Sequence, residues 1–354
     1  MDKISSMQFM TILICSKLFC IFSYVPDGRK NGTLFLITIV IGTLLFSLLM
    51  IPAIKFYNKN NGEGILSFAS SKSRTLSIIL SLIFLLTSLV AIIKVMGSIS
   101  FFLKYGFSDN YTPWAVVIVI SLASFYISQL GISTLARTTG IIVITTFIGL
   151  FLVLCGFQHE IDFMELNLAV EDPASTIIKD IPTLLSNSYE LMAFVLLLGN
   201  LKSKPGKTIY SYLILRMLII AITILAIVLV LGDYVYLSKL PFFSLSSFSQ
   251  TKIFEHFKAF FMFFWSLCAI VKIVLFTICA GVCINQIFPK VKSSISRASV
   301  LIISAATTIP ILMAEKWQSL KLINFQAIII TISFFVIPLI MLMFKKRKTN
   351  AKEN

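Results

Sequence analysis

Long apolar runs separated by short polar segments dominate the pattern of this chain. The clearest runs cover residues 34–54, 113–133, 210–232, 257–284 and 325–344. An α-helix of about 20 residues spans the hydrocarbon core of a bilayer, because each residue adds ~1.5 Å along the axis. Backbone groups inside lipid must be paired within their own segment, so these runs are expected to be helices. The pattern predicts an all-α, polytopic integral membrane protein.

Weaker apolar stretches raise the prediction to ten transmembrane helices in one integral membrane domain, residues 1–354. Ten helices suggest a five-plus-five inverted-repeat transporter fold, in which the first helix of each half is broken near the middle of the membrane. The N-terminal run resembles a signal peptide, but Lys17 interrupts it and no clear small-x-small cleavage site is present, so we expect a retained first span. The predicted spans are 8–25, 34–54, 76–103, 113–133, 140–157, 184–201, 210–232, 257–284, 298–314 and 325–344.

Composition and charge agree with a membrane protein. The chain is 58% hydrophobic and only 13% charged, whereas soluble domains carry about 25% charged residues. The net charge of +15 does not favour nucleic-acid binding, because no basic stretch is interleaved with aromatic residues. With the N-terminus inside, 17 basic residues fall in inner segments and 9 in outer ones, which predicts that both termini are cytoplasmic. Segment 158–181 holds six acidic residues and is expected to be a solvated outer loop or, alternatively, a docking surface.

Five ionisable residues lie inside predicted spans and away from their first two and last two positions, where charge is costly and usually faces the protein interior. Arg216 and Lys94 are expected to extend toward the membrane surfaces, since each lies within reach of the end of its span. Glu190 lies near the middle of the sixth span. A pair with either Lys17 or Lys272 would neutralise its charge.

The first half of the sixth span is polar, with Ser186, Asn187, Ser188 and Glu190 close together. Polar side chains and free backbone amides at an unwound helix can bind a small zwitterion. Hydrogen bonding between helices by Ser and Asn explains the same residues equally well.

Motifs for catalysis are absent. The chain has no nucleotide-binding loop, no HExxH, no GxSxG and no plausible catalytic carboxylate pair, so an enzyme is not expected. His159 and His256 fall in predicted outer loops and are expected to be solvated. Cys279 and Cys283 share a helix face, but no histidine lies near them, so they are expected to be packing residues. No metal or cofactor is expected.

Two short segments have a recognisable form. Residues 3–14 read KISSMQFMTILI, with an ISxxQ start. Thr112 and Pro113 open the fourth span, which runs into GISTLARTTGIIV at 131–143. This segment has the form G-[IL]-x-x-[IL]-A-R-[TS].

A third segment, residues 254–281, carries Glu255, Trp265 and Lys272 in the places of an E-R-L-D…W…K-I element. The three segments, in this order, resemble those of the spore germination permease family. The resemblance covers nearly the whole chain, and length and the basic tail agree with it.

The resemblance implies the B subunit of a nutrient germinant receptor of endospore-forming bacteria, within the amino acid–polyamine–organocation superfamily. Such a subunit is implied to sense a small germinant, often an amino acid, in the spore inner membrane. Its implied partners are a membrane A subunit and a lipoprotein C subunit. The signal is implied to lead to release of ions and dipicolinate.

Some residues differ from the pattern of the family, and these differences bear on which ligand is bound. The first span has no glycine near its expected break, and Lys17 stands where a small residue is expected. His256 replaces Arg in the acidic element. These changes indicate an altered ligand or a receptor that does not bind the usual amino acids.

By the inverted-repeat plan, a ligand lies between the first, third, sixth and eighth spans. Alternatively, the candidate residues only hold the bundle together. Arg137 is expected to have a structural role at the cytoplasmic end of its helix, in a subunit interface or a headgroup contact, and Thr112 and Pro113 are placed in the same structural class. The candidate ligand-binding residues are Ser16, Lys17, Ser186, Asn187, Ser188, Glu190, Trp265 and Lys272.

Other functions fit the same pattern of spans. An active amino-acid transporter coupled to protons or sodium is the main alternative to a sensor. A passive channel opened by partners and a scaffold for the A subunit are further alternatives. Coupled uptake in vesicles separates transport from sensing.

Overall fold

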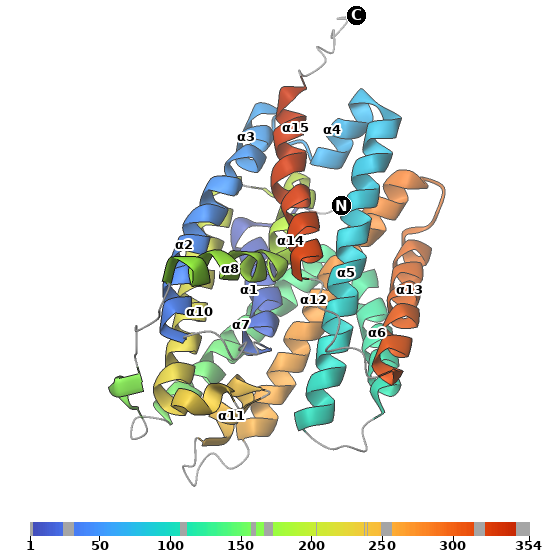
Figure 1. Ribbon diagram of the computed structural model, residues 1–354. Helices are drawn as coiled ribbons and strands as arrows, with labels where there is room; N and C mark the ends of the chain where they lie inside the picture. The colour runs from blue at the N-terminus through green and yellow to red at the C-terminus, as the bar shows by residue number, and fades with distance from the viewer. Residues whose placement is uncertain are drawn as a thin grey trace, which may run out of the picture.

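The structure is a helical bundle (Figure 1). Among the residues that the structure describes, the regular elements are helices, apart from one parallel β-bridge between Ile4 and Leu201. The computed structural model describes residues 3–23, 32–106, 112–156, 161–165, 173–202, 204–236, 238, 240–248, 257–314 and 323–344.

The helices include long bundle helices and several short ones. Short 3-10 elements are η1 (Phe163–Glu165), η2 (Leu198–Asn200) and η3 (Gly232–Tyr236), and η4 (Ile332–Val336) is a π-helical turn. The α-helices are α1 (Ser6–Phe22), α2 (Gly32–Leu49), α3 (Ile51–Lys59), α4 (Ile65–Lys72), α5 (Arg74–Gly106), α6 (Pro113–Gln129), α7 (Ile132–Cys155), α8 (Pro173–Ser186), α9 (Tyr189–Leu196), α10 (Pro205–Leu231), α11 (Pro241–Phe248), α12 (Phe257–Ile287), α13 (Ser293–Met313), α14 (Ile323–Thr331) and α15 (Ile337–Met343).

Most predicted spans correspond to helices. Within the described residues, seven helical segments are long and apolar enough to cross a membrane. α1 and α6 are shorter apolar helices of 17 residues each. The all-α, polytopic membrane class is therefore confirmed. The sixth predicted span, 184–201, differs because it contains the end of α8, a break, the short α9 and η2.

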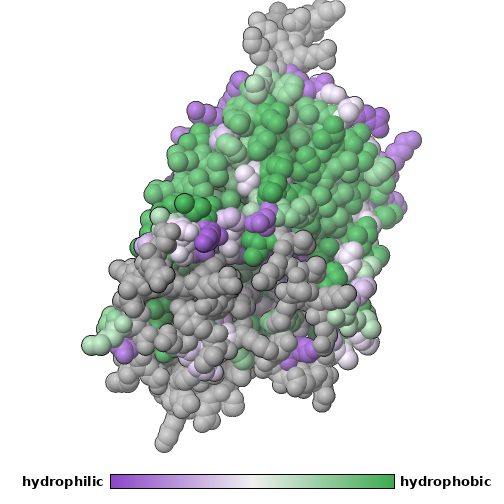
Figure 2. Space-filling model, viewed as in Figure 1, coloured by the Kyte–Doolittle hydropathy of each residue, from purple (hydrophilic) through white to green (hydrophobic). Residues whose placement is uncertain are grey.

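Apolar side chains lie on the outer surface of the bundle, as a lipid environment requires. Large apolar side chains are exposed on the outward faces of several helices, for example Leu44, Leu122, Ile141 and Ile302, each more than 60% exposed. Figure 2 shows a broad hydrophobic band over the described part of one face, with hydrophilic residues gathered at the upper rim. Lipid can cover such a band, whereas water cannot do so without cost.

α1 lies inside the bundle. Its N-terminus is fixed by a capping box in which Ser5 and Gln8 satisfy each other's backbone amides. The helix packs against α7, α10 and α12 and continues unbroken to Phe22. The inverted-repeat expectation of a mid-membrane break is thus not met within α1, because no glycine or proline interrupts its hydrogen bonding.

Segment 158–181 is not a loop throughout, which corrects the prediction. Pro173 starts α8, which lies across the long helices in Figure 1 and packs against α2 and α14. Its residue Asp180 is buried rather than solvated. α8 is strongly amphipathic, so its apolar side chains pack on the bundle although acidic residues flank it.

The fourth and fifth spans are joined more tightly than predicted. α6 ends at Gln129 and α7 starts at Ile132, with Gly131 at φ +86° between them. Glycine adopts this left-handed conformation without strain. Arg137 therefore lies near the start of α7, and its side chain is exposed.

The segment after α9 is anchored firmly. Ile4 N donates to Asn200 O at 2.9 Å, and the hydroxyl of Tyr57 donates to Leu201 O at 3.1 Å. Backbone atoms of Gly64 and Gly199 approach so closely that a Cβ on Gly199 would lie 3.0 Å from the Gly64 Cα. α9 is thus held from its C-terminal side by the N-terminal segment, α3 and the start of α4.

A candidate ligand-binding site at a broken helix

A break at Asn187 and Ser188 separates α8 from α9. Ser and Asn side chains compete for backbone hydrogen bonds, which disfavours them inside helices. Here Asn187 Nδ2 donates to Thr183 O at 3.1 Å, and Ser188 Oγ donates to Leu184 O at 2.6 Å. The carbonyl groups at the end of α8 lose their helical partners, so donors from elsewhere must satisfy them.

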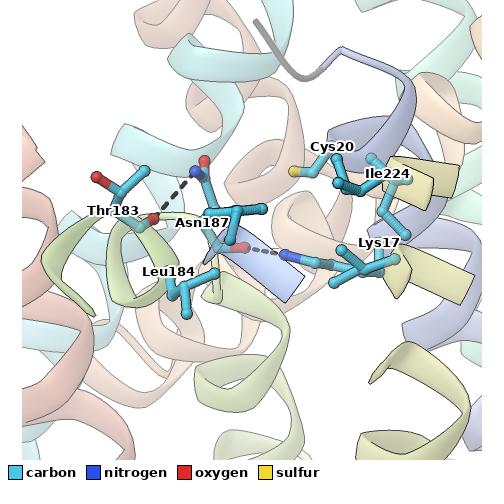
Figure 3. A pocket seen from close by; sticks show the side chains of 9 residues that line it. Lys17, Cys20, Thr183, Leu184, Asn187 and Ile224 are labelled. Carbon is cyan, nitrogen blue, oxygen red and sulfur yellow. Dashed lines mark hydrogen bonds between the residues drawn. The ribbon is translucent and has the colours of Figure 1, made fainter. Parts of the chain in front are cut away.

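Two lysines bind these carbonyl groups. Lys17 Nζ on α1 donates to Asn187 O at 2.7 Å, as Figure 3 shows. Lys94 Nζ on α5 donates to Asn187 Oδ1 at 2.9 Å and to Ser186 O at 3.3 Å. It also donates to Gln326 Oε1 at 3.0 Å. The expectation that Lys94 extends to the outer surface is wrong, because the broken helix offers it acceptors inside the protein.

A buried ion pair lies beside the break. Lys272 Nζ on α12 is 2.6 Å from Glu190 Oε1 on α9, and both side chains are almost fully buried. Lys272 Nζ also lies 2.9 Å from Cys20 Sγ and 3.4 Å from Ser16 O. Ser16 Oγ donates to Glu190 Oε1 at 3.3 Å. Of the two predicted pairings of Glu190, with Lys17 or with Lys272, the structure contains the one with Lys272.

Arg216 on α10 supplies a further buried cation. Its Nη2 donates to Ser188 Oγ at 2.9 Å, and its guanidinium lies 4.7 Å from the centroid of the Phe46 ring. Only 3% of the residue is exposed. The expectation that Arg216 extends to the membrane surface is wrong, since the hydroxyl and the ring replace water around the charge.

Cations therefore converge on one short segment. Lys17, Lys94, Arg216 and Lys272 come from four different helices, and each contacts a residue within 186–190. In the described part of the chain, the only ion pair that any of them makes is Lys272 with Glu190. The cations around residues 186–190 thus outnumber the one carboxylate, Glu190, that this segment contains.

A small cavity adjoins the break (Figure 3). Its volume is about 50 Å³, far below the ~300–1,000 Å³ of typical small-molecule pockets. It has room for one or two water molecules, at about 30 Å³ each. Larger ligands require movement of its walls. The lining residues are Lys17, Cys20, Ile21, Phe35, Thr183, Leu184, Asn187, Ile220 and Ile224.

Seven of the eight candidate ligand residues come together at the break. Trp265 is the exception: its ring stacks on Phe19 and Phe102, and Nε1 donates to Ser23 Oγ at 2.9 Å. It lies two helical turns from Lys272 and does not line the cavity. The seven are Ser16, Lys17, Ser186, Asn187, Ser188, Glu190 and Lys272.

Sequence reasoning missed several residues at this site. The interior position of Lys94 and Arg216 could have been predicted, because charge within an apolar span usually faces the interior. The sequence did not distinguish Cys20, Thr183 and Gln326 as site residues, since such residues occur commonly in membrane helices. Their positions follow only from which helices pack together.

The predicted structural residues lie away from the break. Thr112 is exposed directly before α6, where its side chain makes no capping hydrogen bond, and Pro113 is the first residue of that helix. Arg137 is exposed on α7. His159 and His256 lie outside the described residues.

Metal binding has no support at this site. Within the described ranges, no group of three or more His, Cys, Asp or Glu side chains is placed to hold a metal ion. Cys279 and Cys283 are buried free thiols.

Solved structures share the fold at low sequence identity. A Na+-coupled sialic acid symporter in a substrate-bound, outward-open state matches with a TM-score of 0.66 and 15% identity, over 95% of this chain and 79% of the symporter chain. A mutant of the Eremococcus coleocola manganese transporter matches with a TM-score of 0.56 and 14% identity, over 94% and 79% of the two chains. The same transporter bound to an aromatic bis-isothiourea compound also matches at 0.56 and 15%, with the same coverage. These matches establish a transporter-like fold.

Sequence comparison identifies the family. No curated protein matches the sequence. The model of the family described as "Spore germination protein" matches residues 3–319, nearly the whole chain. This family is transporter-like and not enzymatic. The chain belongs to the spore germination protein family.

Proposed function

We propose that this protein is the B subunit of a nutrient germinant receptor, which binds a small germinant at the α8–α9 break and triggers germination with A and C subunits. The observation that carries the proposal is the break itself, placed inside a membrane bundle and bound by side chains of α1, α5, α10 and α12. A ligand that engages this segment acts on four helices at once.

Sensing follows from the contacts around the break. α9 is anchored from its C-terminal side, whereas α8 reaches the core mainly through α2, α14 and the break. A ligand that displaces Lys17 Nζ from Asn187 O releases α1 from the end of α8. Ligand binding then shifts the protein between two arrangements by the difference in its affinity for them.

Germination of a complemented deletion strain tests the proposal. The wild-type gene should restore the response to at least one nutrient of a broad panel. Lys17→Met should raise the nutrient concentration for half-maximal response about 10- to 100-fold, because the ligand loses a charge-assisted hydrogen bond from the displaced Lys17 ammonium group, worth ~1.5–3 kcal/mol. Lys55→Met, at an exposed position on α3, is the matched control and should behave as wild type. Receptor levels are measured by immunoblot. A strain whose germination never depends on the gene contradicts the function.

Coupled transport is the second candidate, and the shared fold with a Na+-coupled symporter favours it. In such transporters, carbonyl groups at broken helices commonly bind the driving cation. Here lysine ammonium groups bind the carbonyls of Ser186 and Asn187, which favours a sensor that needs no driving ion. Uptake of labelled nutrients into reconstituted vesicles, driven by a proton or sodium gradient, would overturn the sensor.

We further propose that both termini face the cytoplasm in the spore inner membrane. α3 and α4 lie at one end of the bundle and α11 at the other (Figure 1), and α3 and α4 end in the basic residues Lys59 and Lys72. Cys155, exposed at the end of α7, then faces outward. A membrane-impermeant maleimide should label it on intact spheroplasts, with Cys155→Ser as control. Labelling only after permeabilisation contradicts this orientation.

A further inference from the structure

The acceptors that a ligand's ammonium group would use are already occupied. At a broken helix, free carbonyl oxygens are the natural partners of an amine. Asn187 O accepts from Lys17 Nζ, and Ser186 O and Asn187 Oδ1 accept from Lys94 Nζ. The neighbouring carboxylate of Glu190 is paired with Lys272. Glu190 Oε2 has no hydrogen-bond partner among the described residues, but Glu190 does not line the cavity, so an amine entering the cavity meets the Lys17 ammonium group first.

The cavity has one charged wall, and that wall is positive. Lys17 is the only charged side chain among its lining residues, and neither Glu190 nor Lys272 borders it. Lys17 donates to a neutral carbonyl and, in the described part of the chain, forms no ion pair. A buried cation without a counter-ion is costly, so an anion that reaches it gains a strong electrostatic interaction.

The remaining lining is mostly aliphatic. Ile21, Leu184, Ile220 and Ile224 form apolar walls beside the Lys17 ammonium group, with Phe35 completing them. A short hydrocarbon group fits walls of this kind, while a charged or polar end meets Lys17. The cavity volume of about 50 Å³ admits only a ligand of a few heavy atoms unless its walls move.

We propose that the ligand is a small aliphatic carboxylate without an ammonium group, bound through Lys17. This inference rests on the proposed function, because it names the ligand class of the same site. It separates this receptor from one that recognises zwitterionic amino acids. Lys17 is assigned here as the residue that sets this specificity.

Four probes with one carbon skeleton test the ligand class on the purified full-length chain in lipid nanodiscs. Lactate is an anion, alanine a zwitterion, alaninamide a cation and lactamide neutral. Calorimetry should show that lactate binds at least about 10-fold more tightly than alanine, which corresponds to ~1.4 kcal/mol. Alaninamide and lactamide should not bind measurably.

Substitutions of Lys17 separate specificity from folding. Lys17→Arg should keep the preference for lactate, since it retains the charge, whereas Lys17→Met should weaken lactate binding about 10- to 100-fold. Both variants are compared with wild type by thermal unfolding. If Lys17→Met does not fold, Lys17→Arg still tests whether a positive charge at this position is enough for the preference for lactate. Alanine binding as tightly as lactate overturns the ligand class, and so does a folded wild-type chain that binds none of the probes.

The germination assay distinguishes the two possible failures. A gene-dependent response to zwitterionic amino acids alone leaves the receptor function intact and overturns the carboxylate ligand. The absence of any gene-dependent response overturns the receptor function itself. A gene-dependent response to small carboxylates that needs about 10- to 100-fold higher concentrations in Lys17→Met supports both.

Discussion

Lys272→Met is expected to destabilise the folded chain by about 3–5 kcal/mol, because it leaves the Glu190 carboxylate buried without its counter-ion. Glu190 Oε1 would retain only Ser16 Oγ at 3.3 Å, and Oε2 has no hydrogen-bond partner among the residues that the structure describes. A loss of this size is a large fraction of the total stability of a typical protein. Chemical unfolding in mild detergent, followed by helical circular dichroism, measures it.

The double variant Lys272→Met/Glu190→Gln is the matched control. It removes both charges and should recover most of the lost stability, because the desolvation cost of an unpaired ion disappears. Glu190→Gln alone should be costly as well, since it leaves the Lys272 ammonium group buried near Cys20 and Ser16 without a carboxylate. If all three variants unfold at the same denaturant concentration as wild type, the pair does not stabilise this fold.

Trp265→Ala is expected to destabilise the chain by about 3 kcal/mol, through the cavity left in an aromatic stack. The ring is fully buried, with centroids 4.1 Å from Phe102 and 5.0 Å from Phe19. Loss of the indole also leaves Ser23 Oγ without its donor. Thermal unfolding of the full-length chain in detergent measures the effect.

Trp114→Ala provides the same substitution at an exposed position on α6 and should cost little, because lipid covers that ring in the folded and unfolded states. Trp265→Phe should retain most of the stability and should leave ligand selectivity unchanged, since the ring does not line the cavity. A change in selectivity with unchanged stability would instead restore Trp265 to the binding residues predicted from the sequence.

Individual residues show where sequence reasoning was sufficient and where it was not. A pair between Glu190 and either Lys17 or Lys272 was predicted, because a carboxylate inside a membrane needs a cation and few cations lie within spans. The choice between Lys17 and Lys272 remained open, since it depends on which faces of α1 and α12 meet α9. Arg216 and Lys94 were assigned to the membrane surfaces, but the broken helix provides acceptors for both inside the protein.

The apolar runs alone determined the all-α membrane class, because backbone pairing in lipid is a local requirement that each segment must meet by itself. The sequence also showed that the first half of the sixth predicted span is polar. Tertiary structure decided that α8 lies across the bundle and that α1 is unbroken. It also decided that four cations converge on residues 186–190. These features depend on how helices distant in sequence face one another, and hydropathy carries no information about the direction in which a buried side chain points.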